Sequence, residues 1–149
     1  MDRVDVSPLY IKSAYGDPEL EAIACTLIPE FKLWWQTKSH PDFGRDAPYH
    51  DPQASRDSAL MHVHLLPICP PATVIDLQNW GRARRDYDRR SDRHLIYAKS
   101  SCGWAYLLAY EHTDAHEVAR DYDYLRALAA AAEAWYSQTN RFPYEPNYR

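Results

Sequence analysis

The sequence predicts an α+β fold that combines a small antiparallel sheet of about four strands with a long C-terminal helix. Apolar residues recur at helical spacing over residues 18–35 and again over 118–136. Apolar and polar residues alternate over 61–66, as they do in a half-buried strand. Two further apolar runs, 94–98 and 104–110, are separated by a short turn segment, which is typical of a β-hairpin.

The N-terminal part predicts a short strand followed by a helix. The strand lies within residues 4–13 and ends at a turn signal at 15–18. Asp17 can cap the helix, and Pro18 suits its first position. Pro29 lacks an N–H and clashes with the preceding turn, so this segment is either one kinked helix or a helix pair.

The middle of the chain predicts a long loop and then the alternating strand. Residues 38–58 are rich in Pro, Asp, His and Ser without periodicity, which marks a loop of a length that is often functional. The strand after it should place Val63 and Leu65 on one face, with His62 and His64 on the other.

The C-terminal part predicts a basic loop, the hairpin and the last helix. Six Arg and three Asp lie within residues 81–93. Asp114 and Glu117 form a capping-box-like pair at the start of the last helix. On that helix His116, Arg120 and Asp123 would form one polar ridge. We expect a single domain over residues 1–136 and an irregular C-terminal tail over residues 137–149.

Composition excludes several classes of protein. A length of 149 residues with 46% hydrophobic residues is sufficient for one core, and four glycines argue against Gly-rich dinucleotide and phosphate loops. Because no apolar run approaches the roughly 20 residues of a membrane span, and three scattered cysteines suit a reducing compartment, we expect a soluble, cytoplasmic protein without membrane contact. The net charge of −4 argues against a protein that coats nucleic acid electrostatically.

Histidine is the most suggestive residue type, with seven in the chain. Its side chain can move protons near neutral pH. The segment His62-Val63-His64 points two imidazoles to one side of the sheet, as a metal site could begin, but no third ligand has a recognisable spacing. Half-exposed structural histidines, a metal site and a metal-free polar active face all remain open, and no cofactor is predicted.

Two further segments combine groups that bind phosphate. Phe43-Gly44-Arg45-Asp46, with Tyr49 and Asp51 after it, brings together a guanidinium, carboxylates and a phenol. Residues 116–121 lie on the first turns of the last helix, where free N–H groups attract phosphate. Each segment also has a structural interpretation, as a loop held by local hydrogen bonds or as a solvated helix face.

In their order and spacing, these segments resemble the YafO family of bacterial toxins, which are ribosome-dependent mRNA endonucleases of type II toxin–antitoxin systems. The resemblance runs from about Pro18 to Tyr136, whereas residues 82–93 are longer and more basic than the family pattern, and the tail is an extension. The matching segments are Phe43-Gly44-Arg45-Asp46 with Tyr49 and Asp51, His62-x-His64-Leu65, a Pro-Pro pair, His94-Leu95-Ile96-Tyr97, Trp104 with Leu107-Leu108, and His116-x-Val118-Ala119-Arg120-Asp121.

The resemblance implies a fold like that of the RelE-type microbial RNases, by analogy. The N-terminal helix or helix pair would cover one face of the sheet and leave the other open to RNA. His62 and His64 would line the open face beside either His94 or Tyr97. The partners would be mRNA in the ribosome, the ribosome itself and a cognate antitoxin protein.

The resemblance also implies site residues for cleavage without a metal. Two protons must be transferred and the phosphate must be held by cations. A metal-dependent hydrolase built on His62 and His64, or a non-catalytic module that binds ribosomes or proteins, remains the alternative. The expected roles are proton transfer by His64 and His116, phosphate binding by Arg45 and Arg120, orientation by Asp46 and Asp121, and base stacking by Tyr49 or Tyr97, with His62 and His94 as further catalytic candidates. Docking on RNA by Arg84, Arg85, Arg89 and Arg90 is expected from the arginine content of residues 81–93 and not from the resemblance, and a solvated surface is the alternative for that loop.

Overall fold

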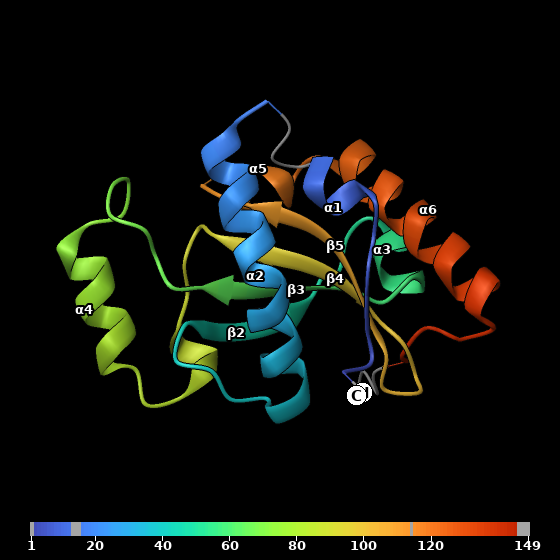
Figure 1. Ribbon diagram of the computed structural model, residues 1–149, viewed down its shortest axis with the longest axis horizontal. Helices are drawn as coiled ribbons and strands as arrows, with labels where there is room; N and C mark the ends of the chain where they lie inside the picture. Colours follow the sequence, from blue (N-terminus) through green and yellow to red (C-terminus); the bar gives the residue numbers. More distant parts are fainter. Residues whose placement is uncertain (1, 13–15, 114, 146–149) are drawn as a thin grey trace.

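The computed structural model describes residues 2–12, 16–113 and 115–145 (Figure 1). Its centre is a five-stranded sheet in the order β1-β5-β4-β3-β2, in which β1 runs parallel to β5 and the other neighbours are antiparallel. The α+β class is thus confirmed, with five strands where about four were expected. The strands are β1 (Val4–Val6), β2 (Phe43–Pro48), β3 (Leu60–Leu65), β4 (His94–Lys99) and β5 (Ala105–Glu111).

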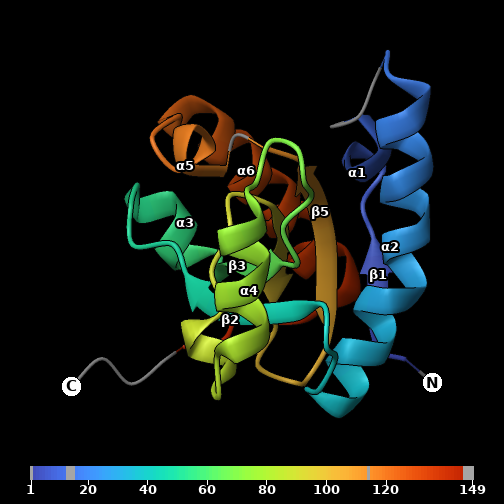
Figure 2. The same ribbon diagram turned by 90° about the vertical axis from the view of Figure 1, so that its left-hand side faces the viewer.

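Helices pack on both faces of this sheet. The helix α2 lies along one side (Figure 2), where its apolar face packs against Val63, Leu65 and Tyr97. The helix α6 packs on the other face against Ile96 and Leu108. The second face is therefore open only in part. The helices are α1 (Leu9–Lys12), α2 (Pro18–Thr37), α3 (Gln53–Asp57), α4 (Val74–Arg82), α5 (Ala115–Val118) and α6 (Tyr122–Thr139), with a 3₁₀ helix η1 (Asp86–Asp88).

The helix α2 is one continuous element rather than a helix pair. Its start is as predicted, because the Asp17 carboxylate accepts N–H groups of Glu19 and Leu20 and Pro18 occupies the first turn. Pro29 lies on the exposed side of the helix, where water can bond to the carbonyl that lacks its N–H partner. Packing of the buried face, which includes Phe31, holds the two halves together.

Several boundaries differ from the sequence-based prediction. The first strand ends at Val6 and is followed by α1, and the expected loop at 38–58 contains β2 and α3. The strand β2 was not predicted because it depends on its pairing with β3, and strand pairing leaves little local signal in the sequence. The helix α4 was missed altogether, although Thr73 and Asp76 form a capping box at its start.

The predicted long C-terminal helix is present as α6, but its predicted start is wrong, because the last helical region is divided into α5 and α6. The Asp121 carboxylate accepts the N–H of Tyr124 and begins α6 after the short helix α5 has ended. His116 and Asp123 therefore belong to different helices and do not form one ridge. Asp114, the expected first cap, lies outside the described residues.

The C-terminal segment begins later than expected and returns to the sheet. The helix α6 continues to Thr139, after which Pro143 forms a bridge to Ser100 and the Tyr144 N–H donates to the carbonyl of Lys99. Among the helices of the described residues, none is long and apolar enough to cross a membrane.

Gly44 allows the closest packing between β2 and the segment that follows η1. A Cβ at this position would clash with the carbonyl oxygen of Arg89, and it would lie 2.6 Å from the Arg89 Cβ and 2.7 Å from the Trp80 ring. We therefore expect Gly44→Ala to lower the free energy of unfolding by about 1–3 kcal/mol, as overpacking does, in urea denaturation.

Gly81 is the matched control, since a Cβ there meets nothing within 4 Å and the residue lies in α4. Gly81→Ala should leave stability unchanged or raise it by up to about 1 kcal/mol, because Ala loses less entropy in a helix. Equal effects of the two changes would show that the approach of Arg89 is not constrained by Gly44.

Candidate active site

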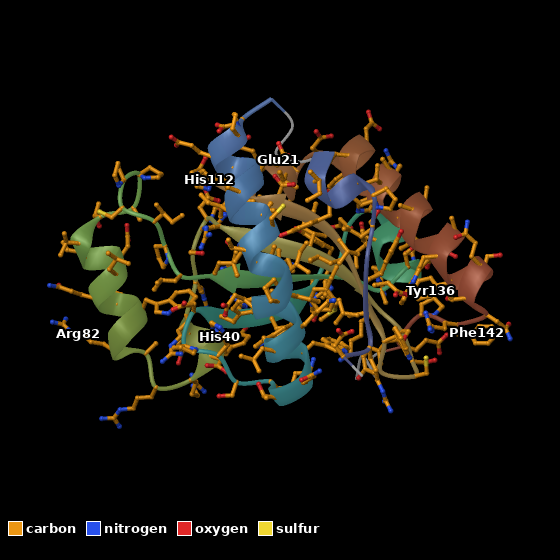
Figure 3. All side chains as sticks on the ribbon, viewed as in Figure 1. Glu21, His40, Arg82, His112, Tyr136 and Phe142 are labelled. Atoms are coloured by element: carbon orange, nitrogen blue, oxygen red, sulfur yellow. The ribbon has the colours of Figure 1, made fainter. Side chains whose placement is uncertain are left out.

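A pocket of about 750 Å³ lies between the end of β3, the helix α4 and the loops that precede β4 and follow β5. This volume is in the range of small-molecule and nucleotide sites. In Figure 3, His112, which lines the pocket, lies toward the left-hand end of the sheet, and Tyr136 lies with α6 toward the right-hand end. Of the predicted site residues, Arg45, His64, Arg90 and His116 line the pocket.

Three imidazoles form a cluster at the base of this pocket. His64 pairs with His94 across β3 and β4, and their ring centroids are 4.1 Å apart. The ring centroid of His62 lies 5.0 Å from that of His94. The alternation along β3 thus places His62 and His64 on one face and Val63 and Leu65 on the α2 face, as predicted.

The backbone of Ser91 determines where two of these rings hold their protons. Its N–H donates to Nδ1 of His64 at 2.8 Å, so the neutral His64 ring has its proton on Nε2. Its carbonyl accepts from Nε2 of His94 at 3.0 Å. The Ser91 hydroxyl donates to the carbonyl of Leu65, which fixes the loop against the end of β3.

Burial keeps the three clustered imidazoles neutral at pH 7. Loss of solvation, reinforced by the neighbouring histidines, lowers the pKa of His62, His64 and His94 to about 3. His64 therefore presents an N–H donor to the pocket rather than a group that exchanges protons. Nδ1 of His62 and Nδ1 of His94 are buried without a hydrogen-bond partner among the described residues.

Arginine side chains form part of the pocket wall. The Arg45 guanidinium lies over the Tyr87 ring, 4.2 Å from its centroid, and donates to its hydroxyl at 2.8 Å. Nε of Arg45 is buried with no partner among the described residues. Arg93 donates to the Tyr110 hydroxyl and to the carbonyl of Leu66. Both cations are thus positioned by neutral groups.

The three carboxylates that line the pocket contact groups other than its arginines. Asp76 caps α4, Asp88 pairs with Arg85, and Asp92 contacts His116. In contrast, none of the arginines that line the pocket forms an ion pair with a carboxylate of the described residues. The guanidinium groups of these arginines are therefore available to an anion such as a phosphate, beside three carboxylates that are held by other groups. These arginines are Arg45, Arg90 and Arg93.

His116 is the accessible imidazole of the site. Its side chain is 73% exposed, and its Nδ1 lies 3.0 Å from Oδ1 of Asp92. The same oxygen accepts the backbone N–H of His116 at 2.9 Å. In contrast, His64 and His94 are buried and His62 is half-buried, and the hydrogen bonds to His64 and His94 come from the neutral backbone of Ser91.

Four predicted site residues lie in structural positions instead. Tyr97 is fully buried against α2 and donates its hydroxyl to Asp46 at 2.7 Å, so it cannot stack a base and Asp46 does not orient Arg45. Tyr49 is buried against the His62 ring, 4.4 Å away, which leaves no ring face for a base. Asp121 caps α6.

The other predicted arginines differ in their ion pairs and in their place in the structure. Arg85 and Arg89 pair with Asp88 and Asp86 three residues away. Arg84 is exposed and has no ion pair with a described carboxylate. Arg120, the expected phosphate ligand, is exposed in the turn after α5 and does not line the pocket.

Besides other lining residues such as His112, the sequence-based prediction missed three adjacent residues of the pocket, namely Ser91, Asp92 and Arg93. Their local signal is weak, because they belong to a segment whose dominant feature is its arginine content. In the described part of the chain, no three His, Cys, Asp or Glu side chains are placed to share a metal ion. The rings of His62 and His64 pack against other aromatic rings.

Comparison with known proteins identifies a family. The family model of toxin YafO, type II toxin–antitoxin system, matches residues 32–137, which include every residue that lines the pocket. No curated protein and no solved structure matches the chain. Because the family model matches more than half of the sequence, the resemblance of the separate motifs is confirmed, and the chain belongs to the YafO family of type II toxin–antitoxin toxins.

Proposed function

We propose that the protein is an endoribonuclease that cuts mRNA in the ribosome and thereby inhibits translation. The observation that supports this most strongly is the pocket itself. It combines three arginines without carboxylate partners, a neutral imidazole donor and an accessible imidazole held by a carboxylate. A type II toxin has a cognate antitoxin as its partner, and we propose that the antitoxin restrains this activity.

The chemistry is transfer of the phosphoryl group to the neighbouring 2′-oxygen of the RNA. A base removes the 2′-hydroxyl proton, the oxygen forms a bond to phosphorus, and the bond to the 5′-oxygen breaks as that oxygen gains a proton. We assign one of these two proton transfers to His116, because it is the exposed imidazole that lines the pocket.

The remaining groups stabilise charge on the phosphate. Arg45 and Arg93 offer planar, two-pronged donors that match phosphate oxygens. Nε2 of His64 has no partner among the described residues, and its N–H can donate to a non-bridging oxygen. This assignment replaces the proton transfer that we expected of His64, since a group with a pKa of about 3 does not exchange protons efficiently at pH 7.

The charge distribution favours a substrate that is presented by the ribosome. The chain has a net charge of −4, so its hold on naked RNA is weak. Arg84 and Arg90 form no ion pair with a described carboxylate and lie in the basic loop, where they can contact ribosomal RNA. Arg85 and Arg89 contribute less to docking in this proposal, because they are paired.

Expression without the antitoxin tests the proposal. We expect growth arrest, with new RNA 5′ ends on a translated reporter message and none on a matched message that lacks its start codon. The purified protein should cut naked RNA poorly, because it depends on the ribosome to place the message. Efficient cleavage of the untranslated message would contradict ribosome dependence, whereas arrest without any cleavage would favour a non-catalytic binding protein.

A further inference from the structure

We infer that Asp92 is the positioning residue for His116, and that it holds this imidazole in the tautomer whose Nε2 is free to accept a proton from the substrate. The inference deepens the proposed function, because it rests on the assignment of a proton transfer to His116. Asp92 comes from the loop before β4 and His116 from α5, so only the folded chain brings them together.

One carboxylate oxygen of Asp92 makes both contacts with His116. Oδ1 accepts the backbone N–H at 2.9 Å and lies 3.0 Å from Nδ1 of the ring. The backbone carbonyl of Asp92 accepts the N–H of Ala115 at 3.4 Å. An ionised carboxylate is only an acceptor, so its charge favours a proton on Nδ1, which leaves Nε2 as the basic nitrogen of the neutral ring.

Because His116 is exposed, its ring depends on the contact with Asp92 for its orientation and its tautomer. An imidazole that is 73% exposed would otherwise sample several rotamers and both tautomers. The ring of His94 flanks it on one side, 6.5 Å away between ring centroids. Asp92 therefore supplies the contact that fixes both the direction of the ring and the site of its proton.

The neighbouring residue has the opposite effect on the buried rings. Ser91 places the proton of His64 and His94 on Nε2, through its N–H and its carbonyl. Adjacent residues of one loop thus fix a donor nitrogen at the base of the pocket and an acceptor nitrogen at its rim. This division matches a reaction that needs a phosphate donor and a base at different places.

The competing interpretation is that Asp92 only caps the start of α5. Asp92→Asn separates the two, because Asn caps a helix about as well as Asp. The Asn amide oxygen can still accept the backbone N–H, but it has no negative charge. It therefore favours a proton on Nδ1 less than the carboxylate does, and the tautomer equilibrium shifts toward the form with its proton on Nε2. We expect the ¹⁵N NMR signals of His116 in the free protein to report this change of tautomer.

The cleavage rate on saturating programmed ribosomes should fall at least about 10²-fold in Asp92→Asn with little change in half-saturating concentration, because the proton transfer is lost and not the binding. Asp92→Glu keeps the carboxylate and should retain the Nδ1–H tautomer and most of the lost rate. Asp123→Asn, an equal charge change on the exposed start of α6, is the control and should change neither property.

The inference is overturned if Asp92→Asn keeps the wild-type rate, loses activity without a change of tautomer, or changes tautomer without losing activity. Unfolding of both Asp92 variants would also overturn it, because it would assign Asp92 to the structure of α5. If the wild-type protein cuts no message, the proposed function fails, whereas the NMR experiment still decides whether Asp92 fixes the tautomer.

Discussion

Replacing His116 by Ala should reduce mRNA cleavage by about 10²–10⁴-fold, which is the contribution of one general acid or base. The free energy of unfolding should change by no more than about 0.5 kcal/mol, because the side chain is largely exposed and outside both cores. Cleavage is measured as the single-turnover rate on programmed ribosomes, and stability by urea denaturation. Growth arrest on induction should disappear in parallel.

His50 provides a matched control, since it is an exposed histidine that does not line the pocket. His50→Ala should keep the wild-type rate. A His116→Ala variant that cuts messages at a rate within about threefold of wild type, well below the contribution of a proton transfer, would remove His116 from the reaction. Loss of activity that only accompanies unfolding would make it a structural residue.

Replacing Arg45 by Ala should reduce cleavage by about 10²–10³-fold, as expected for loss of one donor to a transition-state oxyanion. Arg45 forms no ion pair with a described carboxylate, and its Nε is buried without a partner, so the substitution leaves no orphaned buried charge. The free energy of unfolding should therefore fall by less than about 1 kcal/mol. The rate and the denaturation midpoint are measured on the same preparations.

Arg45→Lys distinguishes geometry from charge. Lys keeps the positive charge but lacks the planar fork and cannot reproduce the contact with Tyr87, so little of the rate should return. Arg126→Ala is the control, because Arg126 is exposed on α6, pairs with Asp123 and does not line the pocket. Full activity of Arg45→Lys would show that the site needs a cation there and not a two-pronged donor.

The sequence by itself predicted those features that depend on local pattern. The cap and helical spacing predict α2 from Asp17 onward, and strict alternation predicts the faces of β3, including the shared face of His62 and His64. The order of the motifs predicts the family, which the match over residues 32–137 confirms. These patterns lie within short segments, so they can be recognised without knowledge of the fold.

Tertiary structure decided the composition of the site. Alternation along β4 separates His94 from Tyr97, but only the position of α2 shows that Tyr97 packs beneath that helix, away from the pocket. The low pKa of His64 follows from burial beneath the loop that contains Ser91, which no local pattern describes. Asp92 reaches His116 from 24 residues away in the sequence. Desolvation and such contacts arise from the packing of distant segments, and this is the physical reason why the roles of individual residues could not be predicted from the sequence.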